Sequence, residues 1–151
     1  MNGNDRGPSS PPAGHRVVPH TADVIIEAWA PTKGQCLEHA VLALVESFVE
    51  SDPGVEPDAV VAIPFTIDAR TDDDQVVALL EEVIYVVETK AVVPIGVQLT
   101  VDAEGVAGTF DTVAAEAVEL VGAVPKGVSR HGLEFRLRDR DGWWCRALVD
   151  V

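Results

Sequence analysis

The sequence predicts a single α+β domain. Two amphipathic helical segments occur in the first 90 residues, and the rest of the chain reads as strands joined by tight turns. The order strand, helix, strand, helix and then about four strands fits an α+β fold better than repeating parallel βαβ units. The chain has 151 residues, 47% of them hydrophobic, which is enough for one core. We expect two helices packed on a mixed or antiparallel sheet.

The first strand and helix follow from residue type and spacing. β-branched and aromatic side chains favour a strand over 24–30, and Pro31 ends it. Thr32 and Gln35 then form a capping-box pattern at the start of a helix. Its apolar residues recur at helical spacing up to the break at 52–54: Cys36, Leu37, Ala40, Val41, Leu44 and Phe48.

The second strand and helix repeat this order. The strand over 60–68 contains Pro64, which predicts a sheet edge or an irregularity because proline has no N–H to donate. Thr71 is placed to cap the helix over 75–89. The aspartates at 72–74 suit the positive end of the helix dipole, which indicates a structural role for them.

Two hairpins complete the expected fold. Strands over 92–101 and 106–112 flank a turn in which Gly105 can supply a positive φ. Segment 113–125 has no clean period, and we expect it to be partly extended. Strands over 127–137 and 143–151 flank the Asp-Arg-Asp-Gly turn of 139–142. Alternation should then place one of the paired tryptophans 143 and 144 in the core and the other on the open face.

Composition indicates the cellular compartment and the kinds of partner that the chain can bind. Residues 1–14 read as a disordered tail and 15–151 as the domain. Cys36 and Cys145 form no Cys-x-x-Cys pair, which fits a reducing cytoplasm, and no apolar run is long enough to cross a membrane. The formal net charge of −14 opposes direct, stable binding of nucleic acid. An acidic chain can instead bind cations or dock on a basic protein.

The segment from His20 to Asp23 is the first candidate site. It follows Pro19 and directly precedes the first predicted strand, where side chains can be rigidly held yet exposed. Aspartate has poor strand propensity, so Asp23 should bond the local backbone, face water or bind a cation. A simple turn and a cation ligand both remain open.

Asp150 and Val151 are the second candidate. Carboxylate and main-chain oxygens suit hard cations, so Asp23, Asp150 and Val151 would form a partial oxygen shell if the strands from the two ends of the chain pair. Acids at a chain end can equally be just solvated. Such a shell has too few oxygens to satisfy Ca²⁺ alone, so water or a partner would complete it.

The basic stretch 126–132 is the third candidate. Lys126, Arg130 and His131 could contact phosphate or an acidic partner, but the same charges also guard an exposed sheet edge. His131 could carry a proton, yet no nucleophile is recognisable beside it, which weighs against a small hydrolase built on Asp23, His131 and Asp150.

The motifs at the two ends of the chain resemble the archease family. His20-Thr21-Ala22-Asp23-Val24 is similar to the family's N-terminal signature. Ser129 to Glu134, Gly142-Trp143 and the ending Leu148-Val149-Asp150-Val151 are similar to its C-terminal half. The likeness covers about residue 15 to the end, and its middle agrees mainly in element order. One departure is the Gly-Val-Ser-Arg after Lys126, where the family more often has Ala-Val-Thr-Tyr.

The resemblance implies a non-enzymatic protein cofactor. Archeases activate an RtcB-type RNA ligase by promoting its GTP-dependent guanylylation and turnover in tRNA splicing or RNA repair. The likeness assigns a divalent metal to Asp23, Asp150 and Val151, with Ca²⁺ first and Mg²⁺ or Mn²⁺ as alternatives. It assigns partner activation to Lys126, with His131 and His20 as further candidates. A chaperone-like binder that keeps an RNA-modifying enzyme soluble is the alternative function.

Overall fold

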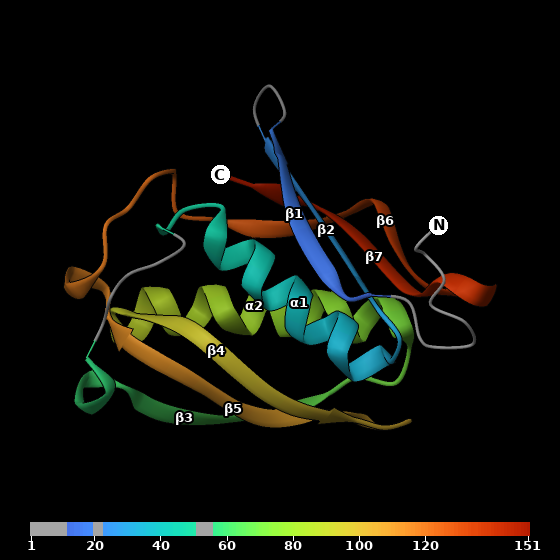
Figure 1. Cartoon of the computed structure of the whole chain (residues 1–151), viewed down its shortest axis with the longest axis horizontal. Helices are drawn as coiled ribbons and strands as arrows, with labels where there is room; N and C mark the ends of the chain where they lie inside the picture. The colour runs from blue at the N-terminus through green and yellow to red at the C-terminus, as the bar shows by residue number, and fades with distance from the viewer. Residues whose placement is uncertain (1–11, 20–22, 51–55) are drawn as a thin grey trace, which may run out of the picture.

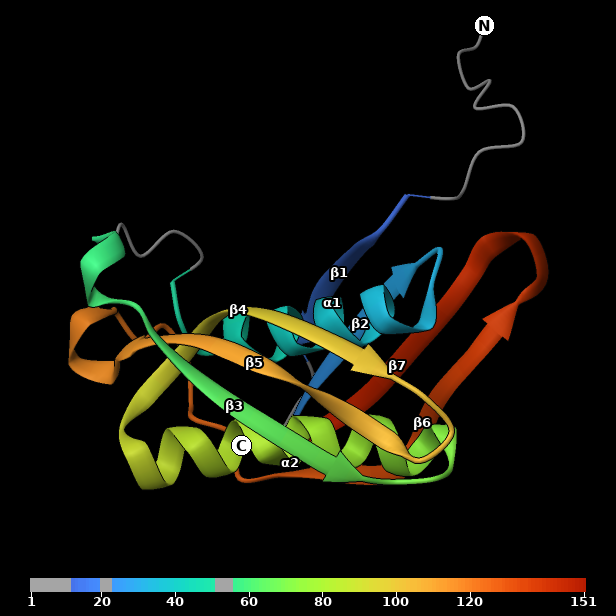
Figure 2. The ribbon, with the colours of Figure 1, turned by 90° about the horizontal axis from the view of Figure 1, so that it is seen from below.

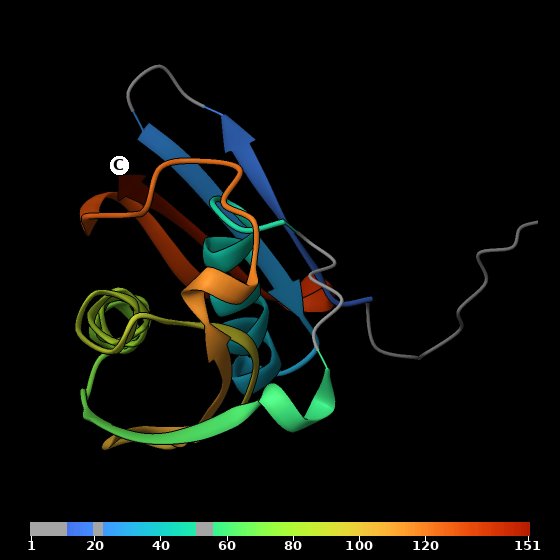
Figure 3. The ribbon, with the colours of Figure 1, turned by 90° about the vertical axis from the view of Figure 1, so that its left-hand side faces the viewer.

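The structure is a computed structural model that describes residues 12–19, 23–50 and 56–151. It is an α+β domain in three layers, with two helices lying between two antiparallel sheets (Figure 1). Viewed from the side, α1 lies between the sheets and α2 runs beside it (Figure 3). The predicted fold class is therefore confirmed, and the strands divide into two sheets rather than one.

The four-stranded sheet has the order β1-β2-β7-β6. Its strands are β1 (Gly14–Pro19), β2 (Asp23–Ala30), β7 (Gly142–Asp150) and β6 (Gly127–Arg138). Each neighbouring pair is antiparallel, so the strands from the two ends of the chain do pair. The sequence analysis did not predict β1, because its six residues include Gly, His, Arg and Pro and lack a strong strand pattern.

The three-stranded sheet has the order β3-β5-β4, formed by β3 (Val61–Asp68), β5 (Gly105–Ala114) and β4 (Val92–Val101). Pro64 lies on the edge strand β3, as predicted. Gly105 does not have the positive φ that we expected. It is needed for close approach instead, because a Cβ there would lie 1.9 Å from the carbonyl oxygen of Ile67.

The helices begin where the capping residues predict. α1 (Lys33–Glu46) starts after Thr32, whose Oγ1 accepts from the N–H of Gln35. α2 (Asp72–Lys90) starts after Thr71, which accepts from the N–H of Asp74 in the same way. Seen from below, the three-stranded sheet crosses in front of both helices (Figure 2). Each helix therefore buries more than one face.

Short 3-10 helices occur at η1 (Pro57–Ala59), η2 (Ala115–Ala117) and η3 (Asp139–Asp141). The segment 113–125 continues β5 to Ala114, passes through η2 and then crosses the end of α1. There Leu120 forms an isolated bridge with Val49, so the segment is partly extended. Among the described residues, no helix is long and apolar enough to cross a membrane.

Alternation along β2 and β7 separates an inner from an outer face of the four-stranded sheet. Ile26, Ala28 and Ala147 are fully buried against the helices, as are both free thiols, Cys36 and Cys145. Burial raises the pKa of the Cys36 thiol to about 12 and that of Cys145 well above its usual value. Trp143 packs against the core and Trp144 lies on the outer face, as the alternation predicts.

Candidate functional site

The two acidic ends of the sequence meet at one end of the four-stranded sheet. Asp23, the first residue of β2, is the direct cross-strand partner of Asp150, the last residue of β7. Asp150 also pairs on its other side with Gly127, the first residue of β6. The C-terminus accordingly lies near the start of β2 in Figure 1. We refer to Asp23, Asp150 and Val151 as the acidic end.

The two aspartates share the outer face of the sheet. Val24 and Val149, next along each strand, pack toward the core, so alternation directs Asp23 and Asp150 away from it. Direct partners on antiparallel strands have Cβ atoms about 5 Å apart, which brings two carboxylates into one neighbourhood. Asp23 is half-buried and Asp150 exposed. Neither forms an ion pair with any residue in 12–19, 23–50 or 56–151.

This donor set matches the chemistry of a hard cation. Carboxylate and carbonyl oxygens are the ligands that Ca²⁺, Mg²⁺ and Mn²⁺ prefer. Asp23 and Asp150 supply two carboxylates, and Val151 adds main-chain oxygen beside them. Within the described part of the chain, no group of three or more His, Cys, Asp or Glu side chains is arranged to hold a metal. Ca²⁺ takes about six to eight oxygen ligands, so Asp23, Asp150 and Val151 by themselves supply only part of a coordination shell.

Lys126 lies next to the acidic end. Its backbone N–H donates to the carbonyl oxygen of Asp150 at 2.8 Å, which fixes the start of β6 beside the end of β7. Lys126 also lines a hollow of about 200 Å³ against the exposed side of α2, with Glu81, Tyr85 and Glu88. The predicted partner-activating lysine thus borders both the acidic end and a surface groove.

His131 is separated from the acidic end along β6. The register of β6 shifts between Ser129, which pairs with Leu148, and Glu134, which pairs with Arg146. At about 3.4 Å per residue, His131 lies roughly 10 Å along the sheet from Asp150. It is exposed, and its backbone N–H donates to Ser129 Oγ at 3.0 Å. His20 falls outside the described residues.

Arg130, in the same basic stretch, has a structural contact. Its guanidinium donates to Asp74 Oδ1 at 2.7 Å and so ties β6 to the N-terminus of α2. This hydrogen bond holds the pKa of the Asp74 carboxyl below its usual value, and the neighbouring Thr71 side chain lowers that pKa further. Asp72 likewise pairs with Lys33 at 2.6 Å. These contacts support the structural role predicted for Asp72 and Asp74.

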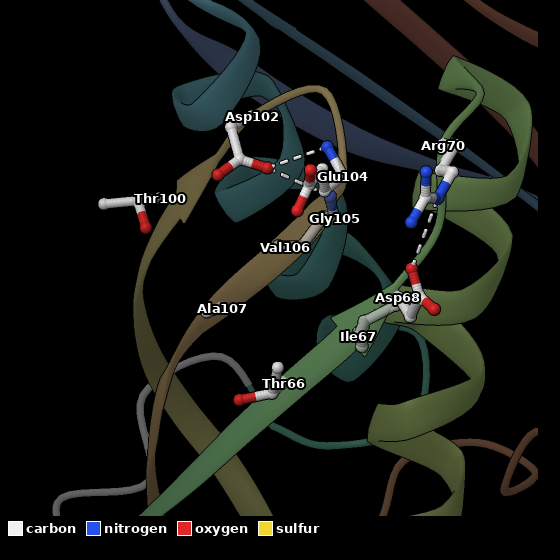
Figure 4. A pocket seen from close by; sticks show the side chains of 10 residues that line it. All are labelled: Thr66, Ile67, Asp68, Arg70, Thr100, Asp102, Glu104, Gly105, Val106 and Ala107. Carbon is white, nitrogen blue, oxygen red and sulfur yellow. Dashed lines mark hydrogen bonds and ion pairs between the residues drawn. The ribbon is translucent and has the colours of Figure 1, made fainter.

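A separate hollow of about 380 Å³ lies at the turn end of the three-stranded sheet (Figure 4). Asp102 accepts there from the backbone N–H groups of Glu104 and Gly105, so it supports the β4–β5 turn. At the rim of this hollow, Arg70 Nε lies 3.8 Å from Asp68 Oδ1. None of the site residues predicted from the sequence lines this hollow.

One group of outer-face residues escaped the sequence analysis. Arg16, Glu27 and Arg146 form a row across β1, β2 and β7, and Trp29 and Trp144 form the next row. The sequence did carry a signal, because Glu27 and Trp29 alternate with buried residues in β2. Of the two arginines that pair with Glu27, Arg16 comes from β1, which was not predicted. Arg146 comes from β7, more than 100 residues after β2 in the sequence.

Comparison with known proteins agrees over most of the chain. Residues 15–151 match the family model described as Archease protein family (MTH1598/TM1083). "Probable protein archease" from Mycobacterium tuberculosis, in strain CDC 1551 / Oshkosh and in strain ATCC 25618 / H37Rv, is 45% identical over 139 residues. Each alignment covers 92% of this chain and 75% of the relative.

A solved structure supports the fold. The solution structure of Methanobacterium thermoautotrophicum protein 1598 aligns with a TM-score of 0.61. The alignment has 20% sequence identity and covers 91% of this chain and 99% of that one. The family model and the relatives in Mycobacterium tuberculosis show that this chain belongs to the archease family.

Proposed function

We propose that this chain is a cytoplasmic, non-enzymatic protein cofactor that activates an RtcB-type RNA ligase. Membership of the archease family supports this role, because the resemblance implies a protein cofactor. The observation that carries the proposal to particular residues is the pairing of Asp23 with Asp150 at an exposed sheet end. In this role the chain promotes the ligase's guanylylation and turnover in tRNA splicing or RNA repair.

The proposed metal ligands are Asp23, Asp150 and Val151, with Ca²⁺ as the first candidate and Mg²⁺ or Mn²⁺ as alternatives. A bound cation supplies positive charge that can orient and neutralise phosphate oxygens. The residues of this chain hold that charge at the end of a rigid sheet and leave coordination positions open. Open positions support action on a partner, because groups of the ligase active site can complete the shell.

Charge also supports an acidic cofactor docking on a basic enzyme. The net charge of −14 opposes stable binding of nucleic acid by the chain as a whole and favours approach to a positively charged protein surface. Lys126 borders the acidic end and is the residue of the basic stretch best placed to touch the docked ligase. His131 lies further along β6 and has a secondary part in this proposal.

The test measures guanylylation of the ligase in the presence of substoichiometric cofactor. Asp23→Ala and Asp150→Ala should each lower the stimulated rate by about tenfold or more, equivalent to ~1.4 kcal/mol. Asp68→Ala is the matched control, because it removes the same charge from an exposed position on the other sheet. If both acidic-end variants are folded and stimulate at the wild-type rate, this assignment is wrong.

A chaperone-like binder of an RNA-modifying enzyme is the second candidate. The observation that favours it is a cluster of exposed apolar side chains in the segment before β6, where Leu120 is 51% and Val121 59% exposed. A binder of this kind protects its client only at stoichiometric amounts. Full stimulation at substoichiometric amounts supports the activator, whereas a linear requirement up to one cofactor per enzyme supports the binder.

A further inference from the structure

Arginine and tryptophan side chains gather on the outer face of the four-stranded sheet, in the part of the sheet that follows the register shift in β6. Cross-strand partners align Arg16, Glu27, Arg146 and Glu134 in one row and Gly14, Trp29, Trp144 and Arg136 in the next. Arg138 follows on β6. We define the arginine–tryptophan face by six of these residues: Arg16, Trp29, Arg136, Arg138, Trp144 and Arg146.

Positive charge is in excess on this face. Four arginines share two carboxylates: Glu27 contacts Arg16 and Arg146, and Glu134 contacts Arg136 and Arg138. The Glu27 side chain is only 12% exposed, whereas that of Arg16 is 60% exposed. Glu27 therefore anchors its two guanidinium groups from below, whereas Glu134 is 36% exposed and lies level with Arg138 at 37%. Because four guanidinium groups share two carboxylates, the surface that meets solvent is basic within an acidic protein.

The tryptophans give the face flat aromatic surface. The rings of Trp29 and Trp144 are nearly parallel, at 18°, with centroids 6.3 Å apart. Arg16 lies over Trp29, with its Cζ 5.5 Å from the ring centroid, and Arg138 lies over Trp144 at 4.1 Å. Gly14 allows this packing, because a Cβ there would lie 2.6 Å from the Trp29 ring. The arrangement is thus built from both edge strands.

This chemistry fits a short segment of single-stranded nucleic acid. Guanidinium groups bind phosphate in a fork geometry, and both guanidinium planes and aromatic rings stack on unpaired bases. An acidic peptide would match the charge but would leave the stacked rings unused. A contact of a few nucleotides needs only a local basic surface, so it is compatible with a net charge that opposes stable binding along a duplex.

We propose that the arginine–tryptophan face binds single-stranded RNA weakly and in a salt-dependent manner. The choice of RNA over DNA rests on the proposed function, which places this protein beside an RNA substrate. With about three phosphates neutralised, log K should fall with log salt at a slope of roughly −2. The acidic end and this face would then engage the enzyme and its RNA from one side of one sheet.

The test is fluorescence anisotropy of a short labelled oligouridylate at low salt, with tryptophan quenching as a second readout. Arg136→Gln/Arg138→Gln should weaken binding by about tenfold, as loss of two phosphate or stacking contacts implies. The matched control is Arg70→Gln/Lys90→Gln, which removes the same charge from exposed positions outside the face. Its affinity should stay within about twofold of wild type, since charge alone acts weakly at a distance in salt.

Several outcomes would overturn the proposal. Absence of binding at low salt, or equal loss in both double variants, would remove the face as a specific site. Equal affinity for the matching oligodeoxyuridylate would refute the choice of RNA, and equal affinity for an oligoglutamate would indicate a face for acidic protein instead. Guanylylation involves no RNA, so Arg136→Gln/Arg138→Gln should still stimulate the ligase at the wild-type rate. The two proposals can therefore fail separately.

Discussion

The two ends of the outer face of the four-stranded sheet differ in how they pair charged side chains across strands. At the acidic end, Asp23 and Asp150 are cross-strand partners of like charge, and neither has an ion-pair partner among the described residues. At the arginine–tryptophan face, Glu27 is a cross-strand partner of both Arg16 and Arg146 and contacts each. Like charges opposite one another destabilise a sheet, whereas opposite charges stabilise it. The second arrangement contributes to folding, and the first is the one that the cation of the proposed function would neutralise.

The register shift in β6 separates these two regions. Before it, Gly127 to Ser129 pair with the last residues of β7, and after it Glu134 resumes the ladder opposite Arg146. Bulges of this kind turn side chains and concentrate at functional edges. A sheet that alternated charge throughout would be more stable but would hold no cation. If the proposed function is right, the acidic end is a position where stability is given up for cation binding.

The largest expected difference between the two regions is the effect of removing one carboxylate on the free energy of unfolding. The Glu27 side chain is only 12% exposed, and its carboxylate pairs with both Arg16 and Arg146. Glu27→Gln removes this shared negative charge and leaves two neighbouring guanidinium groups without it. We expect the free energy of unfolding to fall by about 1 to 3 kcal/mol. Urea denaturation monitored by circular dichroism at neutral pH measures it.

Asp150→Asn is the matched control at the other end of the face. It removes one charge from an exposed residue beside another carboxylate, so the free energy of unfolding should change by no more than about 0.5 kcal/mol without added metal. Equal losses in the two variants would show that the two ends do not differ in the way described here.

A smaller effect is expected where β6 is tied to α2. The hydrogen bond from Arg130 lowers the pKa of Asp74 from its ordinary value of 3.8, so the ionised carboxylate is favoured in the folded state. This contribution to stability is present above pH 3.8 and is lost as the pH falls through the folded-state pKa. NMR titration of the carboxyl should show the depressed pKa, and Arg130→Gln should move it back toward 3.8.

The Asp74 titration also tests the role of Arg130 in the basic stretch 126–132. An unchanged Asp74 pKa in Arg130→Gln would mean that Arg130 is not held by α2 and is free for the partner contact considered from the sequence. Lys126→Gln provides the control, since its main-chain contact is to Asp150 and its side chain lies on the other part of α2. It should leave the Asp74 pKa as it is in the wild-type protein.

Local signals in the sequence predicted most of the fold. Thr32 and Thr71 located the helix starts, Pro64 located a sheet edge, and the turn at 139–142 located the last hairpin. These are short-range effects of capping, a missing N–H and turn chemistry. β1 was missed because its six residues depend on pairing with β2 rather than on propensity of their own.

The candidate site was less accessible from sequence. Asp23 and Asp150 each read as a turn or a solvated end, and the sequence joined them only on the condition that the strands from the two ends of the chain pair. The family resemblance favoured that condition, and the structure shows the two residues as partners. The arginine–tryptophan face could not be predicted, because it assembles residues from four strands spread over the whole chain. Cross-strand register between distant segments is a tertiary property, and no local pattern encodes it.

The most direct test of the acidic end is a titration of the isolated protein with Ca²⁺, and with Mg²⁺ and Mn²⁺ in parallel. We expect heat of binding by calorimetry and a melting temperature that rises with Ca²⁺ concentration, because a ligand of the folded state stabilises it. Asp23→Asn/Asp150→Asn should abolish both effects. Asp68→Asn/Glu104→Gln, which removes the same charge at the other sheet, should retain them. A wild-type protein that shows neither effect with any of the three ions, or an acidic-end variant that responds like wild type, would contradict the account.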